Sequence, residues 1–142
     1  MIPPPDTSDW QLDFDWLRIR HYVKDQLGRP ALPDLNAVLY LIGIQELGRW
    51  EADGFTKEQK QDLMHIAICE LLTYDGFYTF RGRDADGWPH YEAVGTPDYG
   101  DVKAQERRLK QLVVVYFDRL EAENRAIQAA DRGNPEENSS QK

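Results

Sequence analysis

Three side chains that could do chemistry lie at helical spacing in the stretch QKQDLMHIAICELL. Asp62 and His65 are three residues apart, and Cys69 follows one turn later. A carboxylate and an imidazole at this spacing share one face of a helix and can bind the same metal ion. Glu46, in the preceding apolar segment, could supply another oxygen ligand. The candidate metal site therefore consists of Glu46, Asp62 and His65, between the second and third expected helices.

A structural role explains the same residues with fewer requirements. Dinuclear metal sites in helical bundles use two Glu/His pairs and two further carboxylates, whereas this sequence has one pair, with the shorter Asp. On a helical wheel Asp62 and His65 lie opposite the apolar residues, where they would form a hydrogen-bonded couple on a solvated face. Cys69 is expected to be a small buried apolar residue, because a nucleophile needs a lowered thiol pKa. We therefore expect no bound cofactor.

Aromatic residues gather around the segment RDADGWPHYE, where β-forming residues flank a turn pair, Asp86-Gly87. This pattern predicts a two-stranded hairpin, and Pro89 marks the second strand as an edge. Only one face of the hairpin can cover the helices, so the other is expected to carry exposed rings, which form either a satellite core under a loop or a partner or ligand surface. The candidate binding surface consists of Phe77, Tyr78, Phe80, Trp88, His90 and Tyr91.

A calcium loop is excluded in the same segment. Asp84 and Asp86 precede Gly87 at suitable offsets, but Gly82 and Ala93 occupy the positions of the opening Asp and the closing Glu. The Asp residues are therefore expected to shape a turn.

Four helices are expected to position these residues. The first runs from Trp10 to Leu27, where apolar residues recur at helical spacing, and the second follows Asp34 and ends before Gly48. The second is apolar nearly all round and is expected to be the buried centre of the fold. Gly43 within it suggests that another backbone or a bulky ring passes close by.

The third expected helix begins after a capping box formed by Thr56 and Gln59 and runs to about Tyr74. The fourth begins near Asp98 or Asp101 and packs through Leu109, Leu112, Val113, Tyr116, Phe117 and Leu120. The predicted fold is mainly α: four helices, orthogonal or bundle-like, with one β-hairpin between helices three and four.

A chain of 142 residues is long enough for one domain with a real core. We expect that domain to span residues 8–130. Residues 1–7 contain three consecutive prolines and are expected to be flexible, and residues 131–142 lack apolar side chains and are expected to be disordered.

The formal net charge of -8 disfavours nucleic acid and anionic membranes as partners. No signal-peptide pattern and no long apolar run is present, and the single cysteine fits a reducing compartment, so a cytoplasmic protein is expected. Sequence motifs for nucleotide binding and for a hydrolase nucleophile are absent.

The segments LPDLNAVLYLIGIQELG, FTKEQKQDLMHIAICELL and GRDADGWPHYE resemble a small family of uncharacterised bacterial proteins. The resemblance covers residues 33–92. It implies a bacterial cytosolic origin and assigns no functional residue.

Two functions remain open on the sequence alone. The first is a non-catalytic interaction or regulatory protein that binds a protein partner, or a second copy of itself, through the aromatic hairpin. The alternative is a metal-binding protein or metal-dependent enzyme that uses Glu46, Asp62 and His65.

Overall fold

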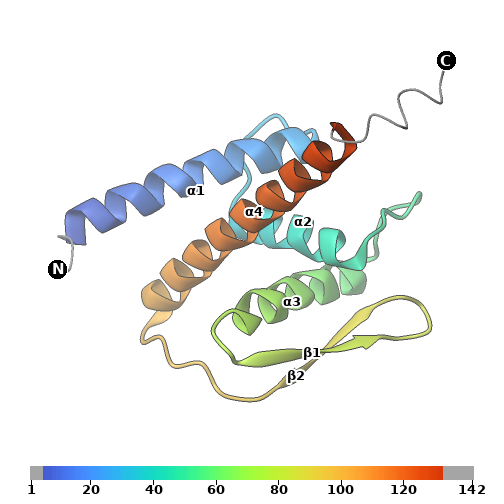
Figure 1. Cartoon of the computed structure of the whole chain (residues 1–142). Helices are drawn as coiled ribbons and strands as arrows, with labels where there is room; N and C mark the ends of the chain where they lie inside the picture. Colours follow the sequence, from blue (N-terminus) through green and yellow to red (C-terminus); the bar gives the residue numbers. More distant parts are fainter. Residues whose placement is uncertain (1–4, 133–142) are drawn as a thin grey trace.

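The computed structural model describes residues 5–132 and contains four helices and one antiparallel hairpin (Figure 1). The elements are α1 (Pro5–Leu27), α2 (Leu35–Leu47), α3 (Lys57–Thr73), β1 (Tyr78–Arg83), β2 (Pro89–Ala93) and α4 (Val102–Arg132). Helix α3 contacts α2, α4 and both strands, while α1 packs against α4 and α2. The mainly α fold, with the hairpin between helices three and four, is therefore confirmed.

Helix α2 is the buried centre that its apolar sequence predicts. Its first turn is capped by Asp34, whose carboxylate accepts a hydrogen bond from Ala37 N at 2.9 Å. It ends at Gly48, which has a φ of 87°, in the left-handed region that favours glycine. Val38 and Ile42 are fully buried. Because α2 is buried on both sides, α1 and α3 pack around it.

The crossing of α2 and α3 depends on Gly43. A Cβ atom built on Gly43 would lie 2.1 Å from the backbone oxygen of Leu63 and 2.6 Å from its carbonyl carbon. No side chain fits in that space, so the two helix backbones touch here. The expectation that another backbone passes close to Gly43 is confirmed.

The expected third helix is confirmed at its start. Thr56 and Gln59 form both hydrogen bonds of a capping box, at 2.9 and 3.1 Å. The α3 residues that face α2 and α4 are buried, including Leu63, Ala67 and Leu71. Because this face is fixed in the core, the opposite face of α3 is turned towards the hairpin and solvent.

Asp84 closes the turn of the hairpin, and Arg83 ties the hairpin to α2. Asp84 Oδ1 accepts from the backbone N of Asp86 and of Trp88, at 2.9 and 3.0 Å, as expected for Asp in a turn. Arg83 donates to the backbone oxygens of Glu46, at 2.7 Å, and of Gly87, at 2.9 Å. The bond from Arg83 to Glu46 connects the C-terminal end of α2 to the strands.

The start of α1 and the end of α4 differ from expectation. Helix α1 begins at Pro5 rather than at Trp10, which fits the tolerance of proline in a first helical turn, so residues 5–7 of the expected flexible segment are helical. Helix α4 begins at Val102, after Asp101 caps Ala104 N at 2.9 Å, as expected, but it continues to Arg132, so residues 131–132 of the expected disordered segment are helical. The remaining terminal residues, 1–4 and 133–142, lie outside the described part of the chain.

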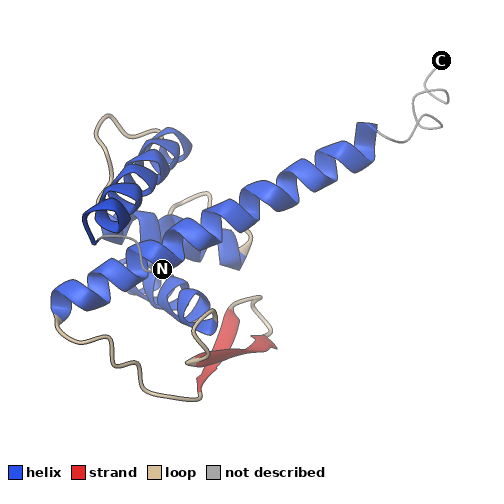
Figure 2. Ribbon diagram, turned by 60° about the vertical axis from the view of Figure 1, so that its left-hand side comes forward, coloured by secondary structure: helices blue, strands red, loops and turns tan. Residues whose placement is uncertain are grey.

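Helix α4 extends beyond the packed body (Figure 2). Its middle contributes the buried residues Leu112, Val113, Tyr116 and Phe117, whereas every residue from 121 to 131 is exposed. None of the helices in the described range 5–132 combines the length and apolar character needed to cross a bilayer.

Candidate functional site

A groove of about 410 Å³ lies between α3 and the hairpin. Its lining residues are Asp62, His65, Ile66, Cys69, Asp84, Trp88, Pro89, His90 and Tyr91. The groove thus brings two of the candidate metal ligands together with three of the candidate hairpin residues. The hairpin packs on the outer face of α3, and this packing places the two groups side by side.

The α3 wall carries an imidazole beside a neutral thiol. Asp62 and His65 are exposed, and His65 Nε2 lies 3.5 Å from Cys69 Sγ. Cys69 is buried, as expected, and burial raises its pKa to about 11, although a hydrogen bond with Tyr78 acts in the opposite direction. The thiol is therefore protonated at neutral pH and is a poor nucleophile.

The hairpin wall carries a carboxylate that is held ionised. His90 Nε2 lies 2.9 Å from Asp84 Oδ2, and this bond, together with the backbone N–H of Trp88, lowers the pKa of Asp84. Trp88 is half-buried and packs against the smaller apolar cluster of Ile44, Leu47, Phe55 and Leu63. This packing holds the Trp88 ring in place, and the ring forms an apolar part of the groove wall.

Glu46 lies apart from this groove. Tyr116 Oη donates to Glu46 Oε2 at 2.6 Å, and Glu46 lines a different cavity, together with Glu70 and Arg119. The structure therefore does not bring Glu46 to Asp62 and His65. Among residues 5–132, no group of three or more His, Cys, Asp or Glu side chains is arranged to hold a metal ion.

Tyr91 connects the groove to the cavity that Glu46 and Glu70 line. Its hydroxyl donates to Glu70 Oε1 at 2.8 Å. Burial raises the pKa of Glu70, and the nearby charge of Glu46 raises it further, whereas the bond from Tyr91 lowers it. Burial likewise raises the pKa of Tyr91, so its hydroxyl stays protonated and continues to donate. The bond fixes the position of the Tyr91 ring in the groove wall.

The hairpin aromatics do not form one exposed face. Phe77 and Tyr78 pack against the main core, and Trp88 packs against the smaller cluster. Phe80 is 49% exposed and makes an edge contact with Tyr91 at 5.6 Å between ring centroids. Phe77, Tyr78 and Trp88 thus contribute to the two apolar clusters, while Phe80 and the groove wall remain accessible.

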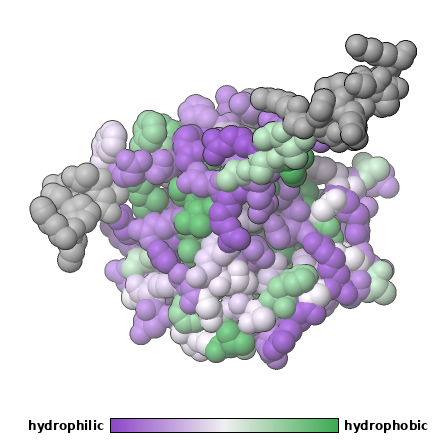
Figure 3. Space-filling model, in the orientation of Figure 1, coloured by the Kyte–Doolittle hydropathy of each residue, from purple (hydrophilic) through white to green (hydrophobic). Residues whose placement is uncertain are grey.

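The segment that contains the hairpin is acidic in sequence. The segment from residue 74 to 101 contains Asp75, Asp84, Asp86, Glu92, Asp98 and Asp101, against Arg81 and Arg83 as its basic residues. Asp75 and Glu92 are paired with arginines, Arg108 and Arg81 respectively. Asp62 adds another carboxylate from α3. The molecular face in Figure 3 is largely hydrophilic, with apolar residues in separate patches.

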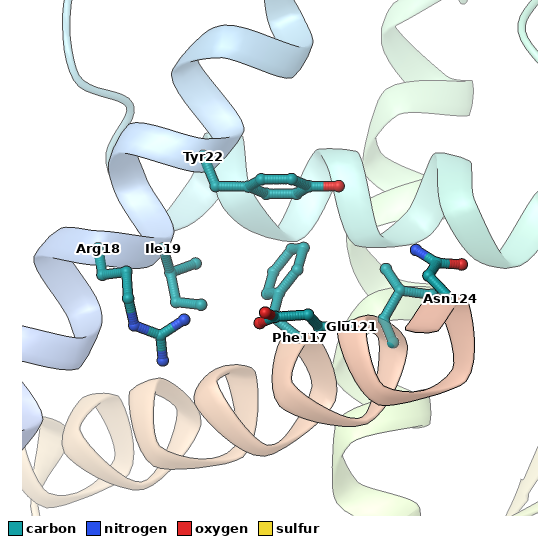
Figure 4. A pocket seen from close by; sticks show the side chains of 7 residues that line it. Arg18, Ile19, Tyr22, Phe117, Glu121 and Asn124 are labelled. Carbon is teal, nitrogen blue, oxygen red and sulfur yellow. The ribbon is translucent and has the colours of Figure 1, made fainter. Parts of the chain in front are cut away.

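A second depression, of about 330 Å³, lies between α1 and α4 (Figure 4). Ile19, Tyr22 and Phe117 line its apolar part, and Arg18 and Glu121 lie at its edge. The rings of Tyr22 and Phe117 meet edge to face, with 5.6 Å between centroids. This depression is shaped by the packing of two helices, and its polar lining residues are Arg18, Glu121 and Asn124.

Helix α1 also carries apolar residues on its outer face, which the prediction of a single amphipathic face did not include. Trp10, Phe14 and Leu17 are all exposed on that helix. Their spacing of four and three residues was the available signal, because it places them on one side of a helix.

No family model, curated protein or solved structure matches this chain.

The arrangement of Asp62 and His65 predicts a protein without a tightly bound transition metal. We expect elemental analysis of purified protein to find less than stoichiometric iron, zinc and manganese. We also expect His65→Ala to lower the free energy of unfolding by at most about 1 kcal/mol, since His65 is exposed. One equivalent of metal that is lost in His65→Ala would contradict this prediction.

Proposed function

We propose that this protein is a non-catalytic binding module whose groove between α3 and the hairpin receives a basic side chain from a partner polypeptide. The observation that carries the proposal is the combination of carboxylates at the groove edge, Asp62 and Asp84, with an apolar wall that includes Trp88. An aliphatic stem with a cationic end fits both features, because the stem packs on the ring and the charge meets the carboxylates.

Two further observations support binding rather than catalysis. The Cys69 thiol is protonated and is a poor nucleophile, and the lowered pKa of Asp84 keeps this side chain a fixed negative charge rather than a proton donor. The partner class is supported by charge, because the hairpin segment is acidic and opposite charges favour association.

Charge reversal in the groove tests this function. The probes are two fluorescein-labelled peptides, Gly-Leu-Arg-Leu-Gly and Gly-Leu-Glu-Leu-Gly, and the measurement is fluorescence anisotropy. We expect wild-type protein to bind the arginine peptide more tightly than the glutamate peptide. Asp62→Lys is expected to weaken binding of the arginine peptide by about tenfold, because like charges then meet in the groove.

The matched control is Asp25→Lys, which makes the same change of charge at an exposed position near the end of α1. If general attraction to an acidic protein caused the binding, both variants would weaken it equally, and the proposal would be wrong. Equal affinity of wild-type protein for the two peptides would also contradict it.

A further inference from the structure

Helix α1 has large apolar side chains on two opposite faces. On the inner face, Ile19 and Val23 are 2% and 0% exposed and belong to the main core. On the outer face, Trp10, Phe14 and Leu17 are 64%, 55% and 44% exposed. A helix that only covers a core needs one apolar face, so the second face requires its own explanation.

The outer face forms a continuous stripe. Residues at i, i+4 and i+7 fall on the same side of a helix, which places Trp10, Phe14 and Leu17 in a row. The rings of Trp10 and Phe14 are stacked, with 5.9 Å between centroids and 14° between planes. In Figure 1 the N-terminal half of α1 lies away from α4, so this end of the helix is accessible.

The charges of α1 divide into two halves. From Trp10 on, where the side chains of α1 are described, the charged residues before Leu17 are Asp13 and Asp15, both acidic. Those after it are Arg18, Arg20 and Lys24, with Asp25 as the exception, and of these Arg18 is already paired with Asp15 and with Asp118 of α4. An antiparallel pair of such helices brings each acidic half against a basic half, whereas a parallel pair brings like charges together.

We propose that the outer face of α1 is a dimer interface, in which it packs antiparallel against the α1 helix of a second copy. A two-fold axis between residues 15 and 16, towards the Leu17 end of the stripe, places Phe14 opposite Leu17 of the partner subunit. The same symmetry brings Asp13 near Arg20 of the partner subunit. Arg20 Nε donates to Pro33 O at 2.7 Å, which holds this side chain along the helix edge.

Self-association brings the stripes of the two copies together. Because a two-fold interface uses the same patch twice, one set of side chains supplies both the apolar contact and the opposite charges. This interface lies on α1, and the groove proposed for the basic partner is lined by residues of α3 and the hairpin, so each surface can be tested separately.

Sedimentation velocity over a range of protein concentrations tests the interface. We expect the wild-type chain to be a reversible dimer. Phe14→Ala is expected to raise the dimer dissociation constant by about tenfold or more, because large rings at the centre of an interface dominate binding. The control is Val115→Ala, which truncates an apolar residue of α4 that is 43% exposed, and it is expected to leave the constant unchanged.

A charge variant tests the orientation. Asp13→Lys is expected to weaken the wild-type dimer by about tenfold in an antiparallel pair, since it places lysine near Arg20 of the partner subunit. In a parallel pair the same change relieves repulsion between acidic halves and strengthens association, which would overturn the orientation. A monomeric wild-type chain, or a Phe14→Ala dimer as tight as wild type, would overturn the interface. Circular dichroism checks that each variant is folded, and little loss of core packing is expected from Phe14→Ala because Phe14 is 55% exposed.

Discussion

Gly43→Ala is expected to lower the free energy of unfolding by about 3 kcal/mol, since the added methyl group forces α2 and α3 apart. The atom that it meets is the backbone oxygen of Leu63, at 2.1 Å, and backbone cannot move aside as a flexible side chain can. Alanine is favoured over glycine within a helix by about 1 kcal/mol, but that gain is smaller than the expected packing cost. Urea denaturation measures the difference.

The control for this variant is Gln45→Ala, on the same helix but at an exposed position. It is expected to change stability by less than about 0.5 kcal/mol. If Gly43→Ala were as stable as wild type or more stable, the helices could not touch at this point, and the described crossing of α2 and α3 would be wrong.

Leu39→Ala is expected to lower the free energy of unfolding by about 2–5 kcal/mol, because it leaves a cavity in the main core. Leu39 is 3% exposed and belongs to the cluster that joins α2 to α1, α3 and α4. The loss is measured by urea denaturation, with Val102→Ala as the truncation of a residue that is 76% exposed. A loss at Leu39 below about 0.5 kcal/mol would mean that α2 lies at the periphery.

Much of the fold could be predicted because its signals are local. The caps at Asp34 and Thr56 act within one helical turn, and the apolar run of α2 permits only a buried position. Asp86-Gly87 marks the hairpin turn in the same way, and Gly87 has a φ of 87°. In each case the residues that decide the structure are neighbours in the sequence.

The groove could not be predicted because it depends on contacts between distant segments. Its two walls come from α3 and the hairpin, and the pattern of neither segment shows which face meets the other. Glu46 illustrates the difficulty. Its place near the end of α2 suggested proximity to Asp62 and His65, yet it bonds to Tyr116, 70 residues away in the sequence.

Helix α1 shows a different limit. Its inner residues Trp16, Ile19 and Val23 already explained an amphipathic helix, so the second apolar set was not counted. The start at Pro5 also extended the helix so that Trp10 lies within it rather than at its end.

The central claim is that the groove between α3 and the hairpin binds a cationic side chain, and the most direct measurement is the location of that binding. Uniformly ¹⁵N-labelled protein is titrated with N-acetyl-arginine amide, and with N-acetyl-glutamate amide as the control, while amide and indole signals are followed by NMR. We predict that the arginine compound shifts the signals of Asp62, His65 and the Trp88 indole, and that the glutamate compound does not. Shifts that avoid α3 and the hairpin, or equal shifts with both compounds, would contradict the account.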